Sequence, residues 1–200
     1  DRLKNKSEII SGCIVGEPTN VKQMGDTIKI GRRGSFTGSL TVKGIQGHVG
    51  YPDLAENPIN SLFKMLEPFT KIYLDKGTSE FQPSSVMITT IDVNNDASNV
   101  IPGEVKAKFN IRFNTLHSVA SLKSMLKNQF DAITKNYKFD YFCNAEPFLT
   151  SDEELKSTLQ NAIKKVVNVN PEKSTTGGTS DARFIRKICP VIEFGLVGKT

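Results

Sequence analysis

Residues 31–52 read GRRGSFTGSLTVKGIQGHVGYP. Two adjacent arginines between glycines open this stretch. Apolar residues then alternate with smaller or polar ones from Phe36 to Val42, which predicts a β-strand over residues 35–44. The stretch closes on a histidine, His48, between two nearby glycines. Flexible backbone therefore flanks the strand on both sides, and a titratable ring lies in the second flexible segment.

Downstream of this stretch, the apolar periodicity predicts a helix, two strands, a second helix and a last strand. Their expected ranges are about 58–74 with a kink at Pro68, 85–93, 105–113, 118–134 and 139–143. Together with the strand at 35–44, the order over residues 33–144 is β-α-β-β-α-β. This is the order of a ferredoxin-like split βαβ unit.

An apolar run precedes the stretch at residues 9–15, IISGCIV, and stops at a Gly-Glu-Pro triplet. This pattern predicts a buried strand that presents Glu17 at its carboxyl end. Open α/β sheets bind their ligands at that end of the strands. A glutamate in an ordinary surface turn is the alternative interpretation of the same triplet.

After Pro147 the pattern changes to a helix up to about residue 167, a glycine-rich loop, a short helix at 182–188 and a strand at 190–196. Such alternation of helix and strand is typical of an α/β layer. We therefore predict that one domain interrupts another. Residues 1–31 and 147–200 would be segments of a catalytic α/β domain, and residues 32–146 would be an inserted α+β domain.

The composition excludes several classes of protein. Two hundred residues with 38% apolar content can bury a core, and no run approaches the roughly 18 apolar residues that cross a membrane. The net charge of +5 comes from scattered lysines without a dense basic block, so we expect no nucleic-acid and no membrane partner. Three widely spaced cysteines, expected to be reduced, and an N-terminus without a signal-peptide core favour the cytoplasm.

Four segments of the chain resemble zinc-dependent amidohydrolases of the aminoacylase/carboxypeptidase superfamily, and in particular its desuccinylases. They are residues 16–18 (GEP), 31–58, 98–102 (SNVIP) and 177–184 (GGTSDARF). The resemblance extends over essentially the whole chain. It implies that residues 32–146 are a ferredoxin-like lid and dimerisation domain, inserted in an α/β zinc-hydrolase domain.

The resemblance also implies a catalytic role for His48 and metal ligation by Glu17. In the resembling enzymes the histidine of Gln-Gly-His reaches across a dimer interface and donates a hydrogen bond to the oxyanion at the scissile carbonyl. The glutamate of Val-Gly-Glu-Pro binds one of two zinc ions. Both residue types suit these roles, since an aimed donor stabilises developing charge and a carboxylate oxygen is a zinc ligand.

Five further residues are implied to bind an anionic substrate. The planar fork of arginine binds carboxylates bidentately, and the implied substrate, N-succinyl-L,L-diaminopimelate, carries three. We expect Arg32, Arg33 and Arg112 to supply such forks, with Asn99 and Tyr51 as additional contacts. From the pattern alone, Arg112 could face solvent and Asn99 could be a turn residue.

The glycine-rich loop at 177–181 precedes a helix and lacks the Lys-Ser/Thr ending of a P-loop. We therefore expect it to bind a carboxylate and not a nucleotide. Its sequence is close to the desuccinylase version of this loop, which implies that Gly178 and Thr179 contact the substrate.

Most of the implied metal centre is missing from these 200 residues. The resembling enzymes take a His-x-Asp motif, a bridging aspartate and a catalytic Glu-Glu pair from sequence before the matched part, and a final histidine from after it. Glu17 alone cannot hold two zinc ions, or the cobalt that could replace them, because zinc sites use three or more protein ligands. We therefore expect an inactive fragment of a cytoplasmic bacterial homodimer.

The implied reaction is hydrolysis of N-succinyl-L,L-diaminopimelate to succinate and L,L-diaminopimelate, in lysine and peptidoglycan-precursor synthesis. Two alternatives remain open: a sibling deacylase of the acetylornithine deacetylase or aminoacylase type, and a non-enzymatic ferredoxin-like dimerisation module. Dimerisation through an exposed edge strand and the helix that starts at Asn57 is expected in every case.

Overall fold

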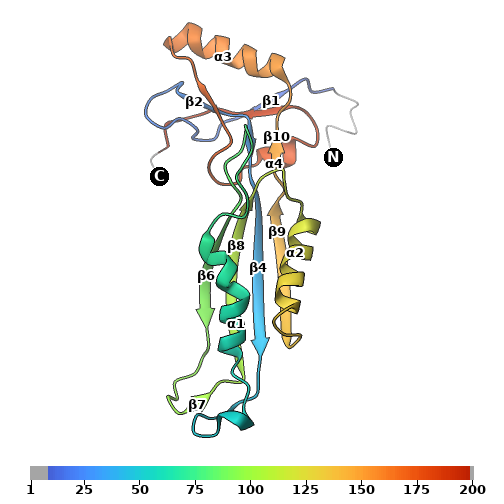
Figure 1. Cartoon of the computed structure of the whole chain (residues 1–200). Coiled ribbons are helices and arrows are strands. Elements are labelled where there is room, and N and C mark those ends of the chain that lie inside the picture. The colour runs from blue at the N-terminus through green and yellow to red at the C-terminus, as the bar shows by residue number, and fades with distance from the viewer. Residues whose placement is uncertain (1–8, 199–200) are drawn as a thin grey trace. The chain divides into compact units, whose positions relative to one another are not determined.

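The computed structural model describes residues 9–198, which form two compact units (Figure 1). Among the described residues, the interrupted unit comprises residues 9–33, Ser79–Gln82 and 147–198, and the inserted unit comprises Gly34–Thr78 and Pro83–Glu146. The chain first crosses between them after Arg33. Both adjacent arginines therefore belong to the interrupted unit, not to the inserted one as expected.

The inserted unit contains a four-stranded antiparallel sheet in the order β6-β8-β4-β9. The strands are β4 (Gly34–Lys43), β6 (Ser85–Asp92), β8 (Glu104–Phe113) and β9 (Tyr137–Ala145). The two central strands, β4 and β8, pair along their whole length, from Gly34 opposite Phe113 to Lys43 opposite Glu104. With one helix between β4 and β6 and another between β8 and β9, the main elements follow the β-α-β-β-α-β order expected from the sequence.

The two helices are α1 (Pro58–Leu66) and α2 (Val119–Asp131). Helix α1 begins as expected, because the Asn57 side chain accepts a hydrogen bond from the Ile59 amide and a proline takes the first helical position. At Pro68 the helix changes into a short 3₁₀ segment, η3 (Glu67–Lys71), which is the predicted break. Helix α2 ends three residues before the predicted Thr134.

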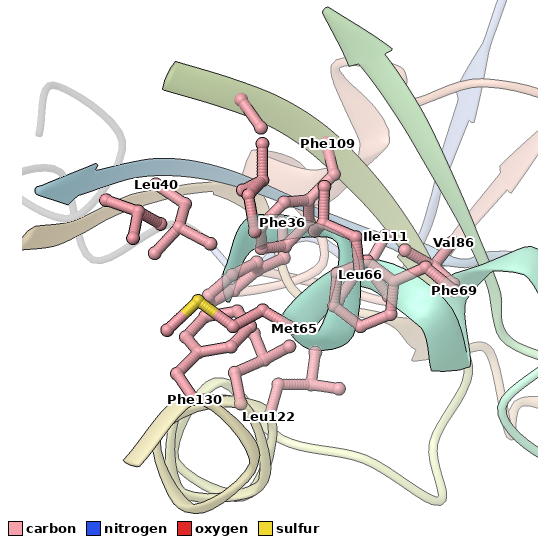
Figure 2. Close-up of a cluster of buried hydrophobic side chains, with 14 of the residues drawn as sticks. Phe36, Leu40, Met65, Leu66, Phe69, Val86, Phe109, Ile111, Leu122 and Phe130 are labelled. Carbon is pink, nitrogen blue, oxygen red and sulfur yellow. The ribbon is translucent and has the colours of Figure 1, made fainter. Parts of the chain in front are cut away.

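The core of the inserted unit lies between these helices and one face of the sheet (Figure 2). Alternate residues of the central strands point into it, and both helices contribute apolar residues from the side facing the sheet. The following members are at most 1% exposed: Phe36, Leu40, Met65, Phe109, Ile111, Leu122, Leu126 and Phe130. Burial of each such side chain contributes roughly 1.5–3 kcal/mol, so this cluster is the main source of the unit's stability.

The opposite face of the same sheet is polar along its central strands, β4 and β8, and exposes Met87 and Phe142 on its outer strands. The Asn110 side chain donates to Thr37 Oγ1 at 2.9 Å and to Ser35 Oγ at 3.3 Å. Arg112 lies on this face, since its neighbours Ile111 and Phe113 are fully buried while it is only partly buried. The predicted alternation along β8 is therefore confirmed.

The interrupted unit contains a mixed sheet in the order β1-β12-β2-β11, with a helix on each face. The strands are β1 (Cys13–Val15), β2 (Thr27–Lys29), β11 (Glu172–Ser174) and β12 (Val191–Glu193). Helix α3 (Glu153–Val167) packs on the face that bears Ile28 and Ile192. The short α4 (Ala182–Ile185) packs on the face that bears Val191. The expectation of an α/β layer is therefore right.

Several predicted bounds in this unit need correction. The run at residues 9–15 is not a buried strand: only β1 is extended, it lies at the edge of the sheet, and Ile14 is 51% exposed. The predicted helix at 182–188 shortens to α4 and the predicted strand at 190–196 shortens to β12. Strands of three residues are too short for a periodic pattern, so β2 and β11 were missed altogether.

Two small pairs of strands complete the chain. Near the crossing points, β3 (Gly31–Arg32) pairs with β10 (Phe148–Leu149), and within the inserted unit β5 (Gly47–His48) pairs with β7 (Val100–Ile101). A further 3₁₀ turn, η2, covers Pro52–Leu54. Between residues 9 and 198, no helix has the length and apolar character needed to cross a membrane.

Candidate functional site

The structure brings together two loops of the inserted unit that are about fifty residues apart in sequence. His48 on β5 lies opposite Val100 on β7, and the amide of Val49 donates to the carbonyl of Asn99 at 3.0 Å. His48, Asn99 and Tyr51 are all exposed. We call this pair of segments, residues 46–52 and 97–103, the β5–β7 loops.

The hydrogen bonds of His48 fix its tautomer. The Gly50 amide donates to Nδ1 of His48 at 3.0 Å, so in the neutral ring the proton is on Nε2. A Cβ at position 50 would lie 3.1 Å from Nδ1, a tight contact with the same ring nitrogen. The Tyr51 ring lies 5.8 Å from the imidazole, centroid to centroid. The imidazole therefore presents a donor, Nε2–H, from an exposed loop.

Arg112 lies far from these loops within one copy of the chain. It is paired with Ser35 on one side and Ser85 on the other, near the end of β8. Glu104, which begins β8 just after β7, is eight residues earlier, and at 3.3 Å per strand residue the separation is about 26 Å. A single copy therefore does not unite His48 and Arg112.

Glu17 lies in the interrupted unit, just past the carboxyl end of β1. Its amide donates to the Val15 carbonyl at 2.9 Å, and its side chain is partly buried. The parallel neighbour β12 ends beside it, where a side chain at Gly195 would collide with the Glu17 carbonyl. The predicted position at the end of a strand is confirmed.

The part of the chain that the structure describes holds no group of three or more His, Cys, Asp or Glu side chains able to bind a metal ion. The cysteines Cys13, Cys143 and Cys189 are free, and Cys189 is buried. Among residues 9–198, Glu17 therefore has no neighbouring set of ligands. These residues do not fit a complete binuclear centre by themselves.

Arg32, expected to bind substrate, is buried in an ion pair that the sequence did not predict. Its Nε lies 3.1 and 3.0 Å from the two carboxylate oxygens of Glu193, and its Nη2 also donates to Glu193. Both residues are nearly inaccessible, at 8% and 1% exposure. Arg33, the next residue, is partly buried at the crossing point between the units.

The glycine-rich loop lies next to this ion pair. Arg32 Nη1 donates to the Thr176 carbonyl at 2.8 Å, and Ser180 Oγ donates to Glu193. Gly177 has a φ of +99°, which favours glycine. Gly178 is exposed and has open space where a Cβ would be, and Thr179 is partly buried. The two residues expected to contact a carboxylate thus lie between the anchored ends of the loop.

Lys29 is a further buried cation that sequence reasoning missed. It is 7% exposed, and its Nζ donates to Ser174 Oγ at 3.0 Å and to Thr176 Oγ1 at 2.6 Å. Burial, and then the positive charge of Arg32, hold the pKa of Lys29 below its ordinary value. No sequence signal pointed to it, since β2 itself was not predicted.

The second histidine of the sequence, His117, lies in a hydrogen-bonded cluster around Asp75. Its Nε2 lies 3.2 Å from Oδ2 of Asp75. Asp75 also accepts hydrogen bonds from the amides of Gly77 and Ser84 and from Asn114 Nδ2. Burial raises the pKa of Asp75, but these hydrogen bonds outweigh it and leave the pKa below its ordinary value. This cluster joins the segments that precede β6 and follow β8.

Comparison with curated proteins gives close relatives over the full chain. The chain is 53% identical to the succinyl-diaminopimelate desuccinylase of Pelagibacter ubique and 48% identical to that of Parvibaculum lavamentivorans, in each case over 100% of the chain. The alignments cover 53% and 52% of these relatives. The chain therefore spans about half the length of the curated relatives it matches.

Comparison with solved structures supports the fold. The aminopeptidase PepT of Bacillus cereus matches with a TM-score of 0.72 and 16% identity, over 91% of this chain and 48% of that one. A tripeptidase of Staphylococcus aureus matches with a TM-score of 0.71 and 16% identity, over 90% of this chain and 48% of that one. The sequence profile of the peptidase dimerisation domain matches residues 30–138. The chain thus belongs to the peptidase dimerisation domain family.

Proposed function

We propose that this chain is part of a longer metal-dependent amide hydrolase of the bacterial cytoplasm, referred to below as the parent protein. It releases succinate and L,L-diaminopimelate from N-succinyl-L,L-diaminopimelate. Identity of 45–53%, over 99–100% of this chain, to proteins named succinyl-diaminopimelate desuccinylase supports this substrate. The structural observation that carries the proposal is the pairing of the His48 and Asn99 segments in the β5–β7 loops.

The inserted unit is proposed to act as a ferredoxin-like lid that also forms a homodimer. Its sheet has two edges, and they differ in chemistry. On β6, Met87 and Ile91 are 55% and 48% exposed, and helix α1 on the β6 side of the unit exposes Phe63 (Figure 1). On β9, Phe142 is 66% exposed, but an ion pair between Lys138 and Asp140 lies along the same strand. Because charges on an edge resist strand pairing, β6 with α1 is the favoured interface.

A two-fold axis at β6 would explain how separated residues meet. Two copies of β6 related by this axis run antiparallel, so the Ser85 end of one lies beside the Asp92 end of the other. Ser85 is paired with Arg112, while Asp92 is paired with Lys106 near the start of β8. This arrangement carries His48 of one copy towards the end of the partner's sheet that bears Arg112.

In this assembly His48 contributes a hydrogen-bond donor. The Nε2–H group, fixed by the Gly50 hydrogen bond to Nδ1, would donate to the oxyanion that forms at the scissile amide. Asn99, Tyr51 and Arg112 would contact the substrate from the inserted unit. Gly178 and Thr179, with Arg33, would contact a carboxylate from the interrupted unit, since Arg32 is held by Glu193 and Thr176.

Hydrolases of this family depend on metal ions, generally zinc. We propose Glu17 as one ligand, because its carboxylate follows a strand at the carboxyl edge of the sheet. The other ligands would come from the remainder of the parent protein. The 200-residue chain alone is accordingly expected to be inactive.

The test is an assay of succinate release by the parent protein from N-succinyl-L,L-diaminopimelate, with and without a zinc chelator. Acetylornithine and an N-acyl amino acid are the competing substrates, and the 200-residue chain is the negative control. We expect chelator-sensitive release of succinate by the parent protein only. A preference for an acetylated substrate would assign the protein to a sibling deacylase instead.

A further inference from the structure

The buried carboxylate of Glu193 binds two side chains, Arg32 and Ser180. Arg32 contacts the glycine-rich loop and Ser180 belongs to it. The carboxylate accepts from Nε and Nη2 of Arg32, and it accepts from the hydroxyl of Ser180. At 1% exposure, Glu193 depends on these partners, because an ionised carboxylate in such a place is stable only when paired and hydrogen-bonded. The last residue of β12 is thereby linked to the carboxyl end of the glycine-rich loop.

Arg32 extends the link to the start of the loop. Its Nη1 donates to the Thr176 carbonyl at 2.8 Å, and a Cβ on Gly177 would come within 2.5 Å of the same nitrogen. The guanidinium therefore lies directly against the backbone where the loop turns. Any change that moved Arg32 would remove its hydrogen bond to Thr176 and its close approach to Gly177.

The part of the loop between these anchors is open. Gly178 is exposed, and no atom lies within 4 Å of the position where its Cβ would be. Thr179 follows, and Arg183 Nη1 lies 3.4 Å from its Oγ1. The structure thus holds the loop at Thr176 and Ser180 and leaves its middle accessible to a ligand.

The charges beneath the loop suit an anion. Lys29 and Arg32 are two buried cations, and Glu193 is the one buried carboxylate among the described residues that pairs with them here. The balance of these three buried groups beneath the loop is one positive charge. Such a field favours a carboxylate over a neutral or cationic group at Gly178 and Thr179.

We propose that Glu193 is a positioning residue: through Arg32 and Ser180 it holds the Thr176–Ser180 loop in the conformation in which Gly178 and Thr179 bind a substrate carboxylate. This inference rests on the proposed function for the identity of the substrate. Beyond the proposed function, it assigns a role to Glu193, which does not contact the substrate. That role is to hold the loop in place.

The test compares Glu193→Gln with Glu154→Gln in the parent protein. Glu154 is an exposed residue of α3 in the same unit, so its substitution removes a carboxylate without touching the loop. Two measurements are made on each folded variant. One is hydrogen exchange of the amides from Gly177 to Ser180, and the other is the steady-state kinetics of succinate release.

We expect amide exchange in the loop to become about tenfold faster in Glu193→Gln and to stay unchanged in Glu154→Gln, because local opening of the loop costs less without its anchor. KM should rise about tenfold with kcat changed less than about threefold, since carboxylate binding is lost before chemistry. A general loss of stability would instead accelerate exchange throughout the unit.

Unchanged loop exchange in folded Glu193→Gln would overturn the proposal, as would faster exchange with an unchanged KM. If Glu193→Gln fails to fold, Ser180→Ala removes one hydrogen bond while leaving the ion pair with Arg32, and the same shifts are expected at smaller size. Absence of succinate release by the unaltered parent protein would refute the proposed function. The exchange measurement would still decide whether Glu193 holds the loop.

Discussion

At the scale of single residues, the chemistry proposed for this chain depends on one imidazole. His48 Nδ1 accepts from the Gly50 amide, so Nε2 carries the proton. We predict that His48→Ala lowers kcat of the parent protein about 100-fold and changes KM little, because a donor aimed at an oxyanion acts in the transition state and contributes roughly 3 kcal/mol. Steady-state kinetics on N-succinyl-L,L-diaminopimelate measure both constants.

The other histidine provides a matched control. His117 lies 3.2 Å from Asp75 in a partly buried cluster, so His117→Gln should lower thermal stability and leave kcat unchanged. Equal losses of kcat in the two variants would point to a general effect on folding. An unchanged kcat in His48→Ala would remove the catalytic role of His48.

The lowered pKa of Asp75 predicts how the stability of the fold depends on pH. Burial raises the pKa of Asp75, but hydrogen bonds from Ser84, Gly77 and Asn114 outweigh this and hold the pKa below its ordinary value of 3.8. A depressed folded-state pKa stabilises the fold above the unfolded-state pKa, and this stability is lost as pH falls through the folded-state value. Asp75→Asn should therefore be less stable at pH 7 and lose less stability between pH 5 and pH 2.

Urea unfolding of the 200-residue chain at a series of pH values measures this dependence. The control is Asp53→Asn, because Asp53 is an exposed residue of the η2 turn in the same unit. The control should follow the unaltered chain at every pH. A parallel pH profile for Asp75→Asn would show that this carboxylate does not carry the acid sensitivity.

Sequence reasoning found the residue types at the candidate site more readily than their partners. His48, Asn99 and Glu17 were located on a loop, a second loop and a strand end, and the structure has them there. Sequence reasoning did not find that Arg32 pairs with Glu193, which lies 161 positions further along the chain. Pairing across such a separation depends on the register of β12 against β2, which no local pattern encodes.

At the scale of elements, we expect a lysine substitution to affect dimerisation differently on the two edge strands of the inserted sheet, β6 and β9. We expect Met87→Lys on β6 to convert the parent protein from dimer to monomer, because at the proposed interface a lysine at this position would be buried without a partner. Phe142→Lys on β9 is the matched control, since Phe142 is 66% exposed on the other edge. Sedimentation velocity at several concentrations separates the two states.

A dimeric Met87→Lys together with a monomeric Phe142→Lys would place the interface on β9 instead. Two dimeric variants would exclude both edges as the main contact. Either result leaves the fold of the unit unaffected, because both side chains lie outside its core.

Long elements were predicted well and short ones were not. The helices and the four strands of the inserted unit have enough residues for a period to repeat, and Asn57-Pro58 and Pro68 mark a start and a break by backbone chemistry. The four strands of the mixed sheet in the interrupted unit have three residues each. Their extended conformation is imposed by neighbouring strands, so a single-sequence pattern misses β2 and overextends β1 and β12.

At the scale of the whole molecule, the sequence indicated that one unit interrupts the other. The change from α+β to α/β pattern near Pro147 is visible in the sequence, and the chain does cross between units there and after Arg33. The short excursion Ser79–Gln82 was not predicted. It joins the interrupted unit in part because Thr175 Oγ1 donates to the Glu80 carbonyl, a contact between segments 95 residues apart.

We propose that His48 of one copy serves the site that contains Glu17 of the partner. In one copy the predicted residues are divided between the β5–β7 loops, the far end of β8 and the interrupted unit. A two-fold assembly through the inserted unit is the proposed means of uniting them. The claim therefore concerns which copy supplies which residue.

Subunit complementation tests this claim most directly. His48→Ala and Glu17→Gln variants of the parent protein are each purified, then mixed, dissociated and reassociated, and succinate release is measured. If His48 acts across the interface, each mixed dimer regains one intact site, and random reassociation restores about a quarter of the unaltered activity. If the mixture stays as inactive as the two separate variants while mixed dimers are present, His48 acts within its own copy and the account is contradicted.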